Sequence, residues 1–459
     1  MPPTSTSLVI VGLGPGDPAH LTLEAHDVLS SADEVWLRTA RHPSVAGLPA
    51  GPHYRSFDDL YEAGSSFETV YSQIVERVLE LAARTEGVVY AVPGHPSFGE
   101  ATTPELLERC QKSDVAARVI PGVSFVDVAA PALGLDPLAD GLLVVDALTL
   151  GGRGRPLVPQ RPTLVAQIYD RRTASHAKLA LLDVYPPDHP VQIVRAAGTD
   201  DETIGVTTLA LLDHADTFDH LTCVFVPPIA PIDDVRTFEG LRAIVARLRA
   251  PDGGCPWDLE QTHESLKRFL IEEAYEALDA LDAGDPARLA EELGDLLMQV
   301  VLHAQVAEDN AEFVIEDVLA SIASKLVRRH PHVFGDVEVS GSQDVLRNWE
   351  TLKGEERGDA PLLDAVPKAM PALAQAQSVQ GRASKAGIAP DQPLLAAELA
   401  RLTDPASTPD IGALGDVLFA LVALARQQDI DAEEALRLSI ARFRDEVAAR
   451  ETRRKAGTG

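Results

Sequence analysis

The sequence predicts a multidomain protein with two α/β subdomains in its first half and an all-α bundle, repeated in degenerate form, in its second half. Up to about residue 229, apolar runs bounded by glycine or proline alternate with amphipathic segments, as in α/β layers. Beyond residue 230, strand signals nearly vanish and apolar residues recur with the period of a helix. The chain has 459 residues, too many for one hydrophobic core.

The α/β half begins with a buried strand at 7–14, a glycine-rich turn and a helix at 21–32. The same strand-into-turn pattern recurs at residues 87–94, 117–124, 162–169, 190–198 and 221–228. Residues 151–162, rich in glycine, arginine and proline, predict a hinge between the two subdomains. The proline-rich stretch 227–235 predicts a linker, so we expect the first domain to span residues 1–229.

The helical half is expected to form two domains, at residues 230–358 and 359–459. In the first, one helix carries an apolar stripe that stops at Gly284, and two more helices follow at 285–310 and 315–330. Helices joined by short turns imply a bundle. In the second, LGDVLFALVALA (414–425) echoes LGDLLMQVVLHA (293–304), which predicts an internal duplication.

The composition excludes more than it identifies. With 70 Asp and Glu against 40 Lys and Arg, the net charge of −30 would repel a nucleic-acid polymer. This acidity is explained either by solubility or by carboxylates gathered around a metal. No apolar run reaches the roughly 18 residues of a membrane span, and residues 1–7 do not look like a secretory signal. Three widely spaced cysteines suit a reducing cytoplasm, where we expect this protein.

Carboxylates are concentrated on two of the predicted helices. The first carries Glu272, Glu273 and Glu276, and the second carries Glu291, Glu292 and Asp295. Positions three and four apart share a helix face, so antiparallel packing would bring four of these carboxylates together. Such a cluster repels itself, and a hard divalent cation such as Mg²⁺ relieves the repulsion. A solvated helix face is the alternative, but the apolar neighbours of Asp295 favour a buried helix and hence a metal site.

These residues resemble the MazG nucleoside triphosphate pyrophosphohydrolases. The matching pieces are EEAYE (272–276), fifteen residues, ELGD (292–295) and KLVRRHPHVFGD (325–336), within about 120 residues. The resemblance implies an all-α bundle, usually a homodimer, that hydrolyses nucleoside triphosphates to nucleoside monophosphate and pyrophosphate. It also implies Mg²⁺, or Mn²⁺ in its place, bound by four carboxylates, with Glu272 orienting or deprotonating the attacking water. The four implied ligands are Glu273, Glu276, Glu292 and Asp295.

Basic residues that follow these helices are candidates to bind the substrate. Lys325 and Arg329 lie one turn apart and are the expected triphosphate clamps, with Arg328 as a close competitor. The alternative is ordinary charge at a helix C-terminus, which complements the helix dipole. Trp349 and Lys353 share a further helix face and, by the resemblance, would contact base and phosphates. Trp349 as a plain core anchor is the competing interpretation.

The C-terminal copy lacks part of this constellation. Ala397, Glu398 and Arg401 stand where the first copy has EEAYE, and Ala413 replaces the glutamate of ELGD, leaving Asp416. Two of four ligands are therefore lost, and one position is a cation. We expect this copy to pack and support but not to hydrolyse.

The first half contains GLGPGD (12–17), which does not fit a dinucleotide fingerprint, because position 17 is aspartate and Pro15 disturbs the helix start. It resembles the tetrapyrrole methylases instead, through VGLGPGDPAHLTLEAHDVLSSADEV, YAVPGHPSFGE (90–100), VIPGVSFVD (119–127) and LTCVFVPP. The resemblance implies S-adenosylmethionine in a cleft between the two subdomains. The implied backbone contacts lie around Gly14, Pro15, Gly94 and Gly122. His95 replaces the family's common aspartate, and a serine pair is reduced to Ser124–Phe125.

Three functions follow from these observations. The first is a pyrophosphohydrolase acting on nucleoside triphosphates, without a nucleic-acid or membrane partner. The second is an S-adenosylmethionine-dependent, tetrapyrrole-type methyltransferase with the MazG part as an accessory. The third is a non-catalytic regulatory scaffold.

Overall fold

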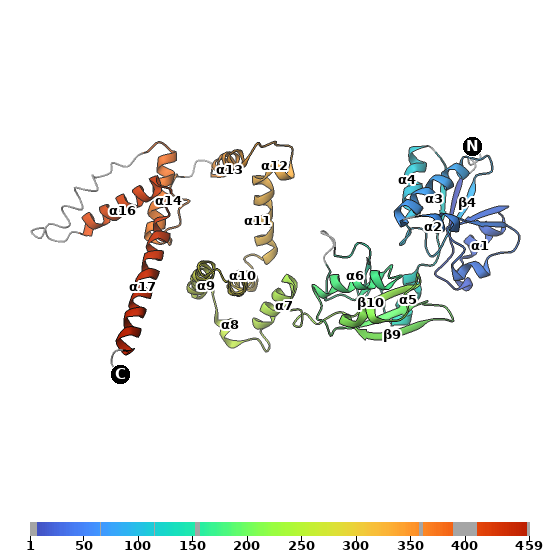
Figure 1. Ribbon diagram of the computed structural model, residues 1–459, viewed down its shortest axis with the longest axis horizontal. Coiled ribbons are helices and arrows are strands. Elements are labelled where there is room, and N and C mark those ends of the chain that lie inside the picture. Colours follow the sequence, from blue (N-terminus) through green and yellow to red (C-terminus); the bar gives the residue numbers. More distant parts are fainter. Residues whose placement is uncertain are drawn as a thin grey trace, which may run out of the picture. The chain divides into compact units, whose positions relative to one another are not determined.

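The computed structural model describes residues 7–64, 66–113, 115–151, 157–357, 361–388 and 411–456 (Figure 1). The chain divides into two compact units, Met1–Val318 and Leu319–Gly459. The first unit holds the α/β part and the helices that carry the carboxylates. The second holds the helices that follow.

The first sheet of the described chain has five parallel strands in the order β3-β2-β4-β1-β5. They are β1 (Leu8–Gly12), β2 (Glu34–Leu37), β3 (His53–Ser56), β4 (Val88–Val92) and β5 (Ala117–Ile120). Its helices are α1 (Leu23–Ser30), α2 (Asp58–Ala63), α3 (Phe67–Ala82) and α4 (Thr102–Lys112). Leu8 and Ile10 pack against α3 and α4, whereas Val11 packs against α1. Both faces are therefore covered, which is why the central strands are almost wholly apolar.

The second sheet is mixed and has the strand order β6-β7-β10-β8-β9. Its strands are β6 (Leu143–Asp146), β7 (Thr163–Ala166), β8 (Pro190–Arg195), β9 (Thr203–Thr208) and β10 (Thr222–Val226). β6 and β7 run parallel, and the other pairs are antiparallel. The helices here are α5 (Phe125–Leu133) and α6 (Arg171–Leu182), with short 3-10 turns elsewhere at Pro18–His20, Pro43–Gly47 and Leu209–His214.

The carboxylate-bearing helices form an antiparallel hairpin. The helices of this region are α7 (Phe238–Leu248), α8 (Pro256–Glu260), α9 (His263–Ala283), α10 (Pro286–Asp309) and α11 (Ile315–Arg329). Thr262 and Ser265 form a capping box at the start of α9, and Gly284 ends it with φ 62°. Asp285 then caps α10, with a proline at its first position. The connection is so short that the two helices must pack side by side.

In the second unit, α11 from Leu319 onward is followed among the described residues by α12 (Pro331–Phe334), α13 (Ser342–Arg357), α14 (Ala372–Lys385), α16 (Ile411–Gln427) and α17 (Ala432–Ala456). Buried Gln380 donates to the carbonyl of Phe419 at 2.8 Å, which ties α14 to α16. Among the described residues, no single helix is long and apolar enough to cross a membrane, while the bent pair α16–α17 meets the criteria of length and composition.

The α/β class of the first half and the all-α class of the second half are confirmed, and six strands lie where apolar runs predicted them. The internal duplication of the helical half stays a prediction. Strands β2, β3, β6 and β9 were not predicted. β3 and β9 are edge strands that are largely exposed, so they lack the continuous apolar run of a buried strand. Residues 152–156 of the predicted hinge and the predicted helical segment 394–402 lie outside the described residues.

One expectation about burial is wrong. The apolar neighbours of Asp295 were expected to be largely buried, yet Leu293 is 50%, Leu297 42% and Val300 38% exposed. The physical reason is that α10 has two apolar faces. One packs on α7 and α9 through residues such as Val301 and Leu302, and the other stays uncovered in the first unit.

Candidate active sites

Three of the four expected metal ligands converge on the α9–α10 hairpin. Oxygen atoms of Glu273 and Glu276 on α9 and of Glu292 on α10 all lie within 4.8 Å of one another. Glu273 and Glu276 are one turn apart on one face, and the short turn fixes α10 so that Glu292 faces them. Asp295 follows Glu292 by one turn and is half-buried. Its oxygens are not part of the close set, but its charge acts on Glu273.

The electrostatics of this cluster are those of crowded anions. Burial raises the pKa of Glu273, and the charges of Asp295, Glu276 and Glu272 raise it further. Glu292, only 9% exposed, accepts a hydrogen bond from Arg288 Nε at 3.2 Å. The donor set consists of carboxylate oxygens, the ligands that Mg²⁺ and Mn²⁺ prefer. The residues present therefore fit a hard divalent cation. Glu272, the expected water-orienting residue, is exposed on α9.

The expected phosphate-binding cations lie at the end of α11. Arg328 and Arg329 both donate to one carboxylate, that of Glu356 on α13. Trp349 makes an edge contact with His330, with ring centroids 5.3 Å apart. Trp349 and Lys353 line a pocket of about 780 Å³ together with Arg382 and residues around it. The sequence did not point to Glu356, because no motif includes it.

The positions of the predicted second copy lie only partly within the described residues. Ala413 is buried on α16 and Asp416 is exposed on the same helix. Ala397, Glu398 and Arg401 lie outside the described residues. The loss of metal binding in this copy stays a prediction.

The α/β half contains a cleft of about 560 Å³ lined by both subdomains. Pro15 and Gly94 line it directly. Gly14 and Gly94 form a two-hydrogen-bond bridge, with N–O distances of 3.2 and 2.8 Å. Gly122 packs against this pair so closely that a Cβ atom on it would lie 2.4 Å from the Gly94 carbonyl oxygen. The carboxyl ends of β1, β4 and β5 thus meet backbone to backbone beside the cleft.

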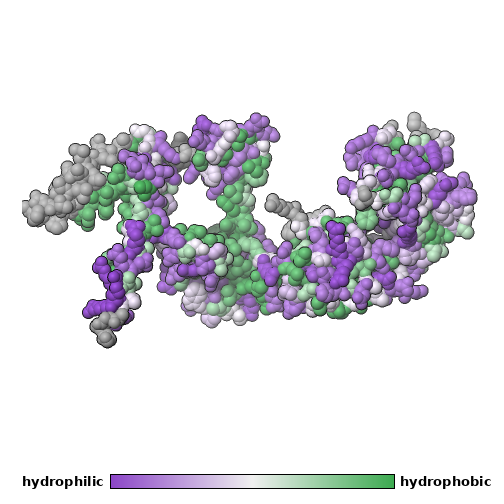
Figure 2. Space-filling view, viewed as in Figure 1, coloured by the Kyte–Doolittle hydropathy of each residue, from purple (hydrophilic) through white to green (hydrophobic). Residues whose placement is uncertain are grey.

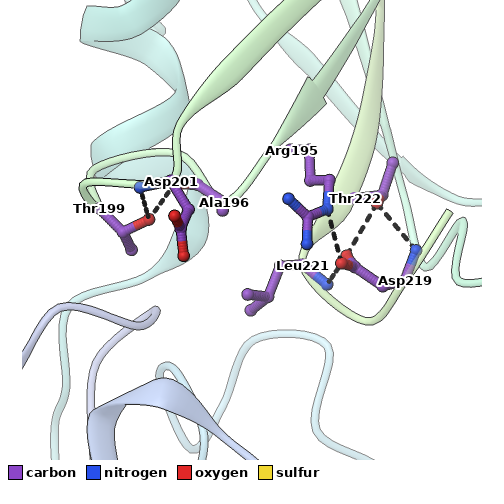
Figure 3. Close-up of polar contacts among 7 residues, drawn as sticks. All are labelled: Arg195, Ala196, Thr199, Asp201, Asp219, Leu221 and Thr222. Carbon is purple, nitrogen blue, oxygen red and sulfur yellow. Dashed lines mark hydrogen bonds and ion pairs between the residues drawn. The ribbon is translucent and has the colours of Figure 1, made fainter. Parts of the chain in front are cut away.

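The second subdomain contributes a strained wall. Gln167, after β7, and Ala196, after β8, line the cleft with φ of 66° and 53°, a region that non-glycine residues rarely adopt. Figure 3 shows how the adjoining loops are held: Asp219 accepts from Arg195 Nε at 2.7 Å and from the Leu221 amide at 2.9 Å. In the same view, the Thr199 hydroxyl donates to the Ala196 carbonyl at 2.8 Å. Such strain is typical of ligand-binding loops.

Other polar groups that line the cleft were also missed from the sequence. Arg38 lines the cleft and donates to the buried carboxylate of Glu100 at 2.7 Å. His42 and His220 line it as well, and burial lowers the pKa of His42 to about 3, so this imidazole is neutral at physiological pH. Arg38 and His42 share the loop after β2, but Glu100 and His220 come from distant parts of the chain, so no local pattern links all four.

The crowding at Gly122 gives a stability prediction. Gly122→Ala should lower the free energy of unfolding by about 2–3 kcal/mol, because the added Cβ meets backbone atoms of Gly94 and Gly12 that cannot rotate away. Thermal and urea unfolding measure the change. Gly205→Ala, where a Cβ has open space, should stay within about 0.5 kcal/mol of wild type. Equal losses in the two variants would show that the loop packing is unimportant.

Family comparisons agree with this division of the chain. The profile of the family Tetrapyrrole (Corrin/Porphyrin) Methylases matches residues 7–213. The profile of the MazG nucleotide pyrophosphohydrolase domain matches residues 261–334. Among solved structures, a uroporphyrin-III-C-methyltransferase from Thermus thermophilus is 23% identical and covers 49% of this chain and 96% of its own, with a TM-score of 0.39.

Two relatives are similar to this chain, one over less than half of its length and the other over nearly all of it. The Thermotoga maritima nucleoside triphosphate pyrophosphohydrolase/pyrophosphatase MazG is 40% identical over 45% of this chain and 82% of its own length. The Bacillus subtilis (strain 168) protein YabN, named as uncharacterized, is 41% identical over 95% of this chain and 91% of its own. The similarity to YabN spans both domains in the same order. The chain therefore belongs to the family of fused proteins in which a tetrapyrrole methylase domain precedes a MazG nucleotide pyrophosphohydrolase domain.

Proposed function

We propose that the helical half hydrolyses nucleoside triphosphates to nucleoside monophosphate and pyrophosphate in a Mg²⁺-dependent reaction. The observation that supports this most directly is the convergence of Glu273, Glu276 and Glu292 within 4.8 Å. Three carboxylates at that separation are costly without a cation. The MazG relative from Thermotoga maritima adds support, since its name states a triphosphate pyrophosphohydrolase activity.

Each residue then has a defined part in the reaction. Glu273, Glu276, Glu292 and Asp295 would hold the metal, which supplies positive charge for the phosphate oxygens and lowers the pKa of water. Glu272 would orient the attacking water or accept its proton. Lys325, Arg328 and Arg329 would bind the phosphate chain, and Trp349 and Lys353 would contact base and phosphates. In-line attack on the α-phosphorus then expels pyrophosphate, whose charge the cations stabilise.

The test is direct. Full-length protein is incubated with a panel of nucleoside triphosphates and Mg²⁺, and pyrophosphate and orthophosphate are measured separately. Release of pyrophosphate with stoichiometric nucleoside monophosphate supports the proposal. Orthophosphate as the first product, or no product with any nucleotide, contradicts it.

The α/β half has a second candidate function, binding of S-adenosylmethionine. The cleft between the subdomains favours it, since about 560 Å³ suits one molecule of nucleoside size and its rim is backbone made accessible by glycine. The replacement of the family's common aspartate by His95 leaves methyl transfer itself as a separate question.

Gly94→Asn tests this cleft. The variant should lose binding of S-adenosylmethionine and S-adenosylhomocysteine in calorimetry, because Gly94 lines the cleft and has open space for a side chain. Asparagine tolerates the φ of 67°, so the strain should be about 1 kcal/mol or less. Gly134→Asn is the matched control, with φ 69°, open space and no place in the cleft lining. Undiminished binding by Gly94→Asn would place the cofactor elsewhere.

We also propose that the helical half forms a homodimer. Leu293, Leu297 and Val300 make an exposed apolar stripe on α10, and Ile271 and Tyr275 begin a second one on α9. Figure 2 shows hydrophobic surface over α10 and α11. A patch of this kind on a water-exposed helix marks an interaction site. The MazG resemblance favours a second copy of this chain, bound through the same surface, as the partner.

A further inference from the structure

Glu356 lies on helix α13 and faces two arginines at the end of α11. Its Oε1 accepts from Arg328 Nε at 3.0 Å and Arg328 Nη2 at 2.6 Å. Arg329 Nε contacts the same oxygen at 3.2 Å, and Arg329 Nη2 contacts Oε2 at 2.5 Å. One carboxylate is therefore shared by two guanidinium groups. All three residues belong to the second unit.

This arrangement is the one in which guanidinium groups bind a phosphate. Parallel N–H donors of an arginine match carboxylate and phosphate oxygens equally well, so an internal carboxylate and an external phosphate compete for the same donors. Hydrogen bonds from Arg329 and Arg328 lower the pKa of Glu356 to about 2, so it is ionised at neutral pH. The arginines are thus already occupied by an anion.

The partial exposure of the three side chains to water makes it feasible for a phosphate to replace the carboxylate. Arg329 is 16% and Glu356 23% exposed, whereas Arg328 is 55% exposed. An ion pair that reaches water contributes little net stability, because water screens it. The helix that carries Glu356 also carries Lys353 one turn earlier and Trp349 two turns earlier. Displacing the carboxylate would therefore leave both arginines available to a ligand that α13 itself contacts.

We propose that Glu356 is an internal competitor of the substrate phosphates, which must displace its carboxylate in order to engage Arg328 and Arg329. The assignment of these arginines to the phosphate chain rests on the proposed function. Every phosphate ligand that binds both arginines displaces the same carboxylate, so Glu356 weakens the binding of each by a similar factor. The pair would thereby help the product to leave.

The experiment measures anion binding rather than turnover. Inorganic tripolyphosphate and inorganic phosphate are titrated into full-length protein by calorimetry, for wild type and Glu356→Gln. The variant should bind both tripolyphosphate and phosphate roughly tenfold more tightly, because neither ligand then has to displace a carboxylate. The double variant Arg328→Gln/Glu356→Gln should lose most of the gain.

Controls separate competition from simple charge removal. Glu338→Gln removes an exposed carboxylate of the same unit that makes no hydrogen bond or ion pair among the described residues, and it should leave both affinities unchanged. Glu356→Asp keeps the charge on a shorter stem and should fall between wild type and Glu356→Gln. Unfolding curves show whether each variant is folded. An unchanged or weaker affinity in folded Glu356→Gln, or an equal gain in Glu338→Gln, overturns the proposal.

The result is distinguishable from failure of the proposed function. If Glu356→Gln tightens tripolyphosphate binding while no nucleotide yields pyrophosphate, the hydrolysis proposal fails and the competition stands. If pyrophosphate is released but neither anion binds more tightly to Glu356→Gln, the reverse holds.

Discussion

Replacement of Glu273 by glutamine, or of Asp295 by asparagine, is expected to reduce Mg²⁺-dependent pyrophosphate release by roughly 100-fold or more. Glu273 is the residue on which the charges of Asp295, Glu276 and Glu272 converge. Removing either charge relaxes this repulsion, so the apo protein should be no less stable. The same change weakens metal binding, so activity and stability should move in opposite directions. Initial rates at several Mg²⁺ concentrations, with thermal unfolding of the metal-free protein, measure both.

Glu291→Gln is the matched control for these variants. Glu291 precedes Glu292 on α10, is exposed, and is not part of the close carboxylate set. Its loss should change the rate less than about threefold, as for a surface substitution. If Glu291→Gln impairs release as much as Asp295→Asn, the general acidity of the helix is responsible, and the proposed metal site is wrong. Higher Mg²⁺ should partly rescue Asp295→Asn, because weakened binding can be offset by concentration.

Leu297→Asp should convert a homodimer into a monomer. Leu297 is 42% exposed at the middle of the α10 stripe, flanked by Leu293 and Val300 at helical spacing. A carboxylate buried at an apolar interface lacks a partner and costs several kcal/mol, enough to dissociate a micromolar dimer. Light scattering during size exclusion measures the mass. Activity should fall with the dimer, since the stripe lies on the helix that holds Glu292 and Asp295.

Val206→Asp provides the comparison. Val206 is 73% exposed on β9 of the α/β half. The substitution therefore adds the same charge as Leu297→Asp, but at an apolar surface position outside the proposed interface. Its mass should equal that of wild type. A monomeric wild-type protein, or a dimer that survives Leu297→Asp, would contradict this interface.

The sequence predicted what depends on local pattern. Apolar runs located β1, β4, β5, β7, β8 and β10, because a strand covered on both faces consists almost entirely of apolar residues. Helix ends followed from single residues, such as Gly284 in its left-handed conformation. Spacing alone placed Glu273 and Glu276 on one face, and the short turn then brought Glu292 beside them. These features need only neighbours within a few residues.

What the sequence did not predict depends on distant contacts. Glu356 meets Arg328 across 28 residues, and Arg38 meets Glu100 across 62. The second apolar face of α10 was misjudged for a related reason: an apolar residue indicates that a surface prefers cover, but not whether the same chain provides it. Cleft residues such as His42 and Gln167 acquire their roles only when two subdomains meet.

The two-residue connection between α9 and α10 has a consequence for how this domain can change. A helix turns by about 100° per residue, so the length of that connection sets the rotational phase of one helix against the other. Substitutions along either helix alter contacts one at a time. A single inserted or deleted residue at Gly284–Asp285 would instead rotate all of α10 and carry Glu292 away from Glu273 and Glu276 together. The hairpin is therefore expected to tolerate substitutions along its helices better than the insertion or deletion of one residue at its turn.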